Sequence, residues 1–151
     1  MRSLDDKARK AKGKKAAIGP DIDLDAYSLE SPAHGELKNL QVLPAADREK
    51  MALAGLDISK GGRAGTYIQK DAFPIHAGSQ QDGLEIIPIK KALAEMDWIQ
   101  EYYWKLASVD ADKYTARARL HLQNGYVIRA LPGKKITLPA QACLYLDKEG
   151  F

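Results

Sequence analysis

The chain has 151 residues, which is enough for one domain of ordinary size with its own hydrophobic core. Hydrophobic residues make up 45% of the chain and charged residues 28%, a composition that excludes a wholly disordered or collagen-like protein. The formal net charge of +3 is unevenly distributed, because residues 1–17 hold seven Lys and Arg against two Asp and leave the rest nearly neutral.

The sequence also indicates the cellular compartment of the protein. No apolar run approaches the roughly 18–20 residues of a membrane-spanning helix, and the N-terminus has no apolar segment like that of a secretory signal. We therefore expect a cytoplasmic protein that has no membrane partner. The single cysteine, Cys143, cannot form an internal disulfide, and alone it cannot supply the thiolates of a zinc or iron–sulfur site.

Residues 1–17 form a basic tail. Ser3 followed by Asp5 and Asp6 is typical of a helix start, so we expect a short, polar, solvent-exposed helix over residues 4–12. A basic tail attracts nucleic acid or other acidic surfaces. This tail has no aromatic residues for base stacking, which argues against a nucleic-acid partner.

Residues 18–42 are predicted to form an extended acidic connector, because prolines, glycines and alternating Asp residues follow one another there. We expect this connector to be mobile in isolation. Three apolar residues within it are available to dock on another surface, namely Ile22, Leu24 and Tyr27.

Residues 43–55 predict a helix, with a proline near its first turn and a glycine as its stop. The glycines of residues 61–65 allow a tight loop, after which a strand is expected to begin at Thr66. Two further short strands are expected at residues 73–76 and 84–87.

The most strongly periodic segment follows Pro88. Apolar residues recur there at spacings of four, three, three and four, which predicts one apolar face on a helix of about four turns. We expect the neighbouring aromatic residues to pack in a core or interface and not to stack on a ligand. The residues of the predicted face are Ile89, Leu93, Met96, Ile99 and Tyr103.

The last third of the chain is rich in strand-forming residues. Residues 112–122 allow either a short helix or a strand, since their apolar residues alternate while Ala and Arg favour a helix. Three β-rich runs separated by Pro-Gly and Pro turns then predict consecutive strands at residues 126–130, 135–138 and 141–146. Together the elements predict an α+β fold.

No residue pattern indicates an active site. The segment KGGRAGTY lacks the spacing of a phosphate-binding loop, so Arg63 is either an anion contact or a turn residue that pairs with a carboxylate. His34, His76 and His121 are far apart and match no metal-binding pattern. Burial in an apolar strand should raise the pKa of the Cys143 thiol and make it unreactive. We expect no catalytic, cofactor or metal site, and thus not an enzyme.

A collinear series of segments resembles the N-terminal part of SufB/SufD-type proteins, the scaffold subunits of the SUF iron–sulfur cluster assembly system. The similarity extends over most of the chain from about Gly19 onward. The segments include GPDIDL, LPAADREKMALAGLDIS, GRAGTYIQKD, LEIIPIKKAL, YYWKL, DKYTARA and GYVIRALPGKKITLPAQACLYL.

The resemblance implies an N-terminal helical and mixed α/β region that leads into a right-handed β-helix, of which residues 126–146 are the first strands. On this basis residues 43–151 form a SufBD-like N-terminal domain that ends in a truncated β-helix. The family's residues for sulfur transfer, cluster assembly and ATPase docking lie mainly in the β-helix and beyond, so no site residue is carried over. The implied partners are SufB/SufD-like and SufC-like subunits.

Two functions of different classes are compatible with the sequence. The first is a non-catalytic scaffold domain in iron–sulfur cluster assembly, which acts through protein contacts and is able to self-associate through an exposed strand edge. The second is a free-standing adaptor or regulator whose tail contacts nucleic acid or another acidic surface. Binding through the tail would weaken steeply with salt, whereas association through a strand edge would not.

Overall fold

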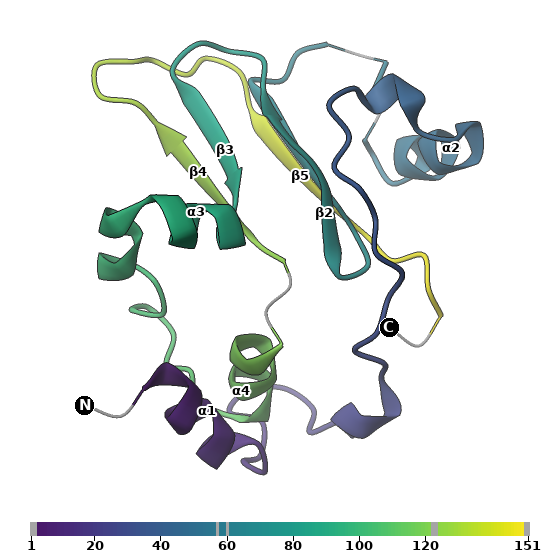
Figure 1. Cartoon of the computed structure of the whole chain (residues 1–151). Coiled ribbons are helices and arrows are strands. Elements are labelled where there is room, and N and C mark those ends of the chain that lie inside the picture. The colour runs from purple at the N-terminus through teal and green to yellow at the C-terminus, as the bar shows by residue number, and fades with distance from the viewer. Residues whose placement is uncertain (1–2, 57, 60, 122–123, 150–151) are drawn as a thin grey trace.

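A computed structural model of the chain describes residues 3–56, 58–59, 61–121 and 124–149. Two small sheets lie together with α2 and α3 beside them, and α1 and α4 form a separate pair at the bottom of the view (Figure 1). This mixture of helices and sheets confirms the α+β class. The helices are α1 (Leu4–Ala11), α2 (Ala45–Leu53), α3 (Ile89–Glu95) and α4 (Lys113–Leu120), with 3-10 turns at Leu24–Ala26, Leu40–Val42 and Asp97–Glu101. The strands are β1 (Gly65–Lys70), β2 (Phe73–Ser79), β3 (Leu84–Pro88), β4 (Tyr126–Ala130) and β5 (Ala140–Tyr145).

The two sheets share one hydrophobic core. The first has the order β2-β1-β5, with β2 antiparallel and β5 parallel to β1, and the second pairs β3 with β4 antiparallel. Tyr67 of β1 lies at the centre of this core, fully buried among Ala64, Leu84 and Ile86. Its ring also lies 4.5 Å from the ring of Tyr126 on β4, centroid to centroid. The inner faces of the two sheets therefore face each other.

Gly65, the first residue of β1, lies close to Leu84 and Ile86 of the second sheet. A Cβ at this position would lie 2.5 Å from Cδ1 of Ile86, which is too close for any real contact. We predict that Gly65→Ala lowers the free energy of unfolding by about 1–3 kcal/mol, measured by urea denaturation. Adding Ile86→Val removes the Cδ1 atom and should recover part of that loss. A double variant in which the two losses simply add would contradict this close approach.

The opposite face of the three-stranded sheet is covered by α2. Met51 of this helix is fully buried against Ile68 and Ile75, with Leu43 and Leu56 beside it. Because α2 begins after Pro44 and ends before Gly55 as the sequence indicates, the helix predicted over residues 43–55 is confirmed. The strands expected from Thr66 onward and at residues 73–76 and 84–87 are confirmed as β1, β2 and β3.

The helix predicted in the basic tail is present as α1, but it is not a solvent-exposed element. Ala8 and Ala11 are buried against Val109 and Ala116, so α1 packs along α4 through small side chains that let the two helices approach closely. The segment left open between helix and strand is the helix α4, where Asp112 forms a capping box with its first turn.

The connector was expected to be mobile, and this expectation is wrong for its first half, which is held on α4. The Tyr114 hydroxyl donates to the carbonyl of Pro20 at 2.6 Å. Arg117 donates to the carbonyls of Leu24 and Tyr27 at 2.7 and 2.8 Å. Asp21 of the connector also pairs with Lys113 of α4 at 2.7 Å. The acceptors for Tyr114 and Arg117 are backbone oxygens, so the side-chain sequence of the connector gives no sign of those bonds.

The single four-turn helix predicted after Pro88 is also wrong. The helix α3 stops at Glu95, Met96 is extended with φ −128° and ψ 98°, and a 3-10 turn follows. The residues that follow Glu95 are largely Asp, aromatic and β-branched, all of which form helices less readily than Ala, Leu or Lys. Their rings instead form local pairs, Trp98 with Tyr102 and Tyr103 with Trp104. The apolar positions therefore do not line one helical face.

The three consecutive strands predicted near the C-terminus become two strands in different sheets. The runs at 126–130 and 141–146 are confirmed as β4 and β5, but residues 135–138 are not a strand. The Gln81 side chain accepts from the amides of Thr137 and Leu138 at 3.2 and 3.3 Å and donates to the carbonyl of Lys135 at 3.0 Å. This one side chain thus takes the hydrogen bonds that a neighbouring strand would otherwise make.

Candidate functional site

The candidate site consists of apolar side chains on β4 and β5, each of which is an edge strand of its sheet. Residues paired across a sheet point to the same face. Since Ile86 pairs with Ile128, and Tyr67 with Ala142, the side chains of β4 and β5 continue the face that forms the shared core. We call this surface the β4–β5 rim. Its residues are Tyr126, Ile128 and Ala130 on β4, and Ala140, Ala142 and Leu144 on β5.

The rim is exposed although its face is the core-forming one. Leu144 is 64% exposed and Ile128 is 43% exposed, whereas the residues they pair with, Gln69 and Ile86, are each 7% exposed. Among the described strands, β4 and β5 each have a partner on one side only, so their outer edges present unpaired backbone groups. Exposed strand edges with apolar side chains pair readily with another strand. The arrangement is suited to protein contact.

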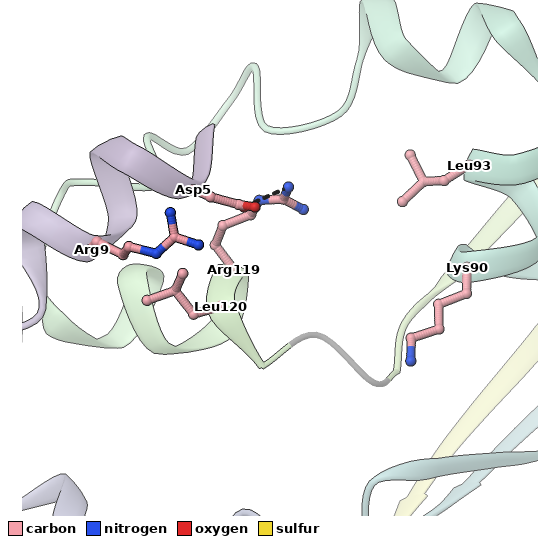
Figure 2. Close-up of a pocket in the computed structure, with 6 residues that line it drawn as sticks. All are labelled: Asp5, Arg9, Lys90, Leu93, Arg119 and Leu120. Carbon is pink, nitrogen blue, oxygen red and sulfur yellow. Dashed lines mark ion pairs between the residues drawn. The ribbon is translucent and has the colours of Figure 1, made fainter. Parts of the chain in front are cut away.

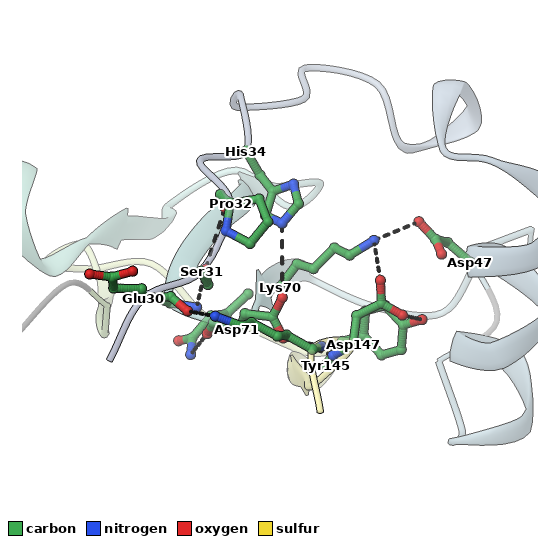
Figure 3. A network of polar contacts seen from close by, with 12 residues as sticks. Glu30, Ser31, Pro32, His34, Asp47, Lys70, Asp71, Tyr145 and Asp147 are labelled. Carbon is green, nitrogen blue, oxygen red and sulfur yellow. Dashed lines mark hydrogen bonds and ion pairs between the residues drawn. The ribbon is translucent and has the colours of Figure 1, made fainter. Parts of the chain in front are cut away.

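A polar network holds the chain where it leaves β5 (Figure 3). The carboxylate of Asp71, only 2% exposed, accepts from the amides of Asp147 and Lys148 at 2.8 and 3.0 Å. Lys148 in turn donates to the Ser28 hydroxyl at 3.2 Å and to the Glu30 carbonyl. This Asp71 network joins the β1–β2 turn, the connector and the segment after β5, and so fixes the C-terminal end of the rim.

A cluster of charges lies beside the Asp71 network. Lys70 contacts Asp47 and Asp147 at 3.2 and 3.0 Å, and the hydroxyl of Tyr145 donates to Asp147 at 2.9 Å. Lys50 of α2 pairs with Asp147 at 3.3 Å. The hydrogen bond from Lys70, followed by those from Tyr145 and Lys50, lowers the pKa of Asp147 from its ordinary 3.8 to about 2.

This lowered pKa predicts a pH dependence of folding. A carboxyl group whose pKa falls on folding stabilises the folded state above its unfolded pKa, and that contribution is lost as the pH falls toward the folded pKa. Acid unfolding of the Asp147→Asn variant should therefore depend less steeply on pH than that of the native chain between 3.8 and about 2. Urea midpoints measured across this range test the prediction, and parallel curves for the two chains would contradict it.

The guanidinium of Arg63 donates to the Gln141 side chain of β5 at 3.1 Å. The histidines lie apart. His34 is 4.0 Å from Asp71, and His76 lies 2.8 Å from the carbonyl of Leu37. His121 follows the end of α4, where burial lowers its pKa. The structure therefore brings none of these four residues into a shared site.

Cys143 lies on β5 and packs against the core under α2, where burial raises the pKa of its thiol as expected. Within the described residues no three His, Cys, Asp or Glu side chains are grouped closely enough to hold a metal ion. In the same part of the chain, no helix is both long and apolar enough to cross a bilayer.

Two important residues were not found by sequence reasoning. Asp71 and Gln81 both act on backbone groups that lie far along the chain, 76 residues away for the Asp71–Asp147 bond and 54 for the Gln81–Lys135 bond. The position of Asp71 between two predicted strands is the available signal, because Asp favours turns and tolerates a positive φ. No local signal marks Gln81.

Comparisons with known proteins point to one family, although no protein-family model matches the chain. Proteins from two strains of Methanothermobacter thermautotrophicus, Winter and Delta H, are each 36% identical over 148 residues, or 95% of this chain and 36% of their own length. A protein from Archaeoglobus fulgidus is 39% identical over 102 residues, or 68% of this chain and 28% of its own length. All three are named iron-sulfur cluster assembly SufBD family proteins.

The chain thus spans about a third of the length of the curated relatives that it matches. The resemblance expected from the sequence is confirmed, and we identify the chain as a SufBD family sequence.

Proposed function

We propose that this chain is a non-catalytic, N-terminal scaffold domain in cytoplasmic iron–sulfur cluster assembly and that it acts through protein contacts. The observation that carries the proposal is the β4–β5 rim, where a core-forming face is left exposed on two edge strands. The process is taken from the names of its relatives, which are iron-sulfur cluster assembly SufBD family proteins.

The β4–β5 rim is suited to the start of a β-helix. In a solenoid each rung buries its apolar face and its strand edges against the next rung. We propose that β4 and β5 are the first strands of a right-handed β-helix and that strands of a SufB/SufD-like subunit continue it and cover Ile128 and Leu144. Full burial of a large aliphatic side chain contributes about 1.5–3 kcal/mol, so two such residues favour this association appreciably.

The proposed division of the chain into a tail, a connector and a domain is consistent with β4 and β5 as the start of a β-helix. Residues 43–151 are the SufBD-like domain, residues 1–17 the basic tail and residues 18–42 the connector. The tail and the first half of the connector lie against α4, and they support the domain on the side away from the sheets (Figure 1). The rim is left for a SufB/SufD-like subunit, and a SufC-like subunit would join the same complex through that scaffold.

Co-purification tests this proposal. The tagged chain is expressed with a SufB-like subunit of the same organism, and the amount retained is compared between Leu144→Lys and Leu53→Lys. Leu144 lies on the rim, whereas Leu53 is 90% exposed on α2 and serves as a control with the same change of residue. A lysine at position 144, which the partner would bury, should weaken binding by about tenfold or more. Equal retention of both variants, or no retention of the native chain, would refute the proposal.

A further inference from the structure

A hollow of about 350 Å³ lies between the α1–α4 pair and α3 (Figure 2). Arg9 reaches it from α1 and Arg119 from α4, while Lys90 and Leu93 border it from α3 on the other side (Figure 2). Leu120 of α4 completes its apolar lining. We propose that this hollow is a binding site for a small organic phosphate. The site lies away from the β4–β5 rim and does not depend on the function proposed above.

Arg119 supplies a guanidinium that is fixed in place before any ligand binds. One of its terminal nitrogens lies 2.7 Å from Asp5, and the other donates to the Tyr103 hydroxyl at 3.1 Å. The same guanidinium carbon lies 5.7 Å from the centre of the Tyr103 ring, within the range of a cation–π contact. A planar cation held in this way loses little conformational freedom when an anion arrives.

The charge balance of the hollow favours an anion. Three of its lining residues are cations and only one, Asp5, is a carboxylate. Arg9 also contacts Asp6 at 3.4 Å, but its side chain is 62% exposed, so this surface pair restrains it weakly. Arginine and lysine together suit a phosphate, since a guanidinium binds its oxygens in a fork and an ammonium adds a point charge.

The apolar lining selects for an organic phosphate over inorganic phosphate. Leu93 and Leu120 border the same hollow as the three cations, so a ligand with a phosphate group and an apolar body contacts both. Such a ligand would touch α1, α3 and α4 together and hold the basic tail against the rest of the fold. This site would also give the basic tail a role, because the protein contacts proposed at the β4–β5 rim do not involve the tail.

Titration calorimetry of the whole 151-residue chain with phenyl phosphate and with inorganic phosphate, at low salt, tests the proposal. Phenyl phosphate should bind saturably with one site per chain and more tightly than inorganic phosphate. Arg9→Gln and Lys90→Gln should each weaken binding by about tenfold, the value of one charge-assisted hydrogen bond. Lys38→Gln, the same change of charge at an exposed lysine outside the hollow, should leave binding unchanged.

Two further variants distinguish specific binding in the hollow from nonspecific attraction of phosphate to a basic surface. Asp5→Asn removes the competing carboxylate and should tighten phosphate binding, whereas Leu93→Ala should remove most of the preference for phenyl phosphate. Circular dichroism checks that each variant is folded. If Arg9→Gln disturbs α1, the loss of phosphate binding is judged from Lys90→Gln. Absence of saturable binding, or an equal loss in Lys38→Gln, would overturn the proposal.

Discussion

Replacing Tyr67 with alanine should lower the free energy of unfolding by about 3–5 kcal/mol, as expected when a fully buried large aromatic residue is truncated. Tyr67 is 0% exposed, and its ring fills the space between the two sheets, 4.5 Å from the ring of Tyr126. Since small domains are stable by only about 5–15 kcal/mol, the variant should be close to unfolding at ambient temperature.

Tyr67→Phe is the matched control for this prediction. It keeps the ring and removes the hydroxyl, which accepts from the Gly125 amide at 3.3 Å and donates to Gln69 at 3.4 Å. These are long hydrogen bonds, so their loss should cost about 1 kcal/mol. Urea denaturation of both variants measures the difference. Similar midpoints for Tyr67→Ala and Tyr67→Phe would show that the sheets do not share a core around this ring.

The second large effect is expected at Asp71. Its carboxylate is the acceptor for two amides of the segment after β5, and it is 2% exposed. Without that carboxylate both amides lose a charged hydrogen-bond partner, and Asp71→Gly should lower the free energy of unfolding by about 2–3 kcal/mol. Urea denaturation gives the total loss, and amide exchange at Asp147 and Lys148 should become faster than in the native chain.

The choice of substitution separates the hydrogen bonds from the backbone. Asp71 has a φ of 49°, a conformation that glycine and asparagine accept but alanine disfavours. Asp71→Gly therefore tests the carboxylate without adding backbone strain, and Asp71→Asn, which keeps an acceptor oxygen, should retain most of the stability. Native stability in Asp71→Gly would contradict the importance of this network.

The sequence predicts elements well where local signals and packing agree. The helix α2 is marked by Pro44 and Gly55, and β1 is marked by the β-branched and aromatic run after Gly65. The prediction fails after Glu95, because a regular spacing of apolar residues outweighed the poor helix propensity of the aromatic and β-branched residues there.

The candidate site was predicted in part. The expectation that residues 126–146 present a strand edge matches the places of β4 and β5 at the ends of their sheets. The face that they expose depends on registers with β3 and β1, which are distant in sequence and leave no local pattern. The same holds for Asp71, Gln81 and Arg119, whose partners are backbone groups or residues on other elements.

The most direct test of the account is amide hydrogen exchange of β4 and β5, measured for the chain alone and with a SufB-like subunit of the same organism. Amides on the outer edges of these strands have no partner strand among the described residues and should exchange fast in the isolated chain. Binding should slow their exchange at least tenfold and leave α2 unchanged. Equal exchange in both samples, despite formation of a complex, would show that the β4–β5 rim is not the contact surface.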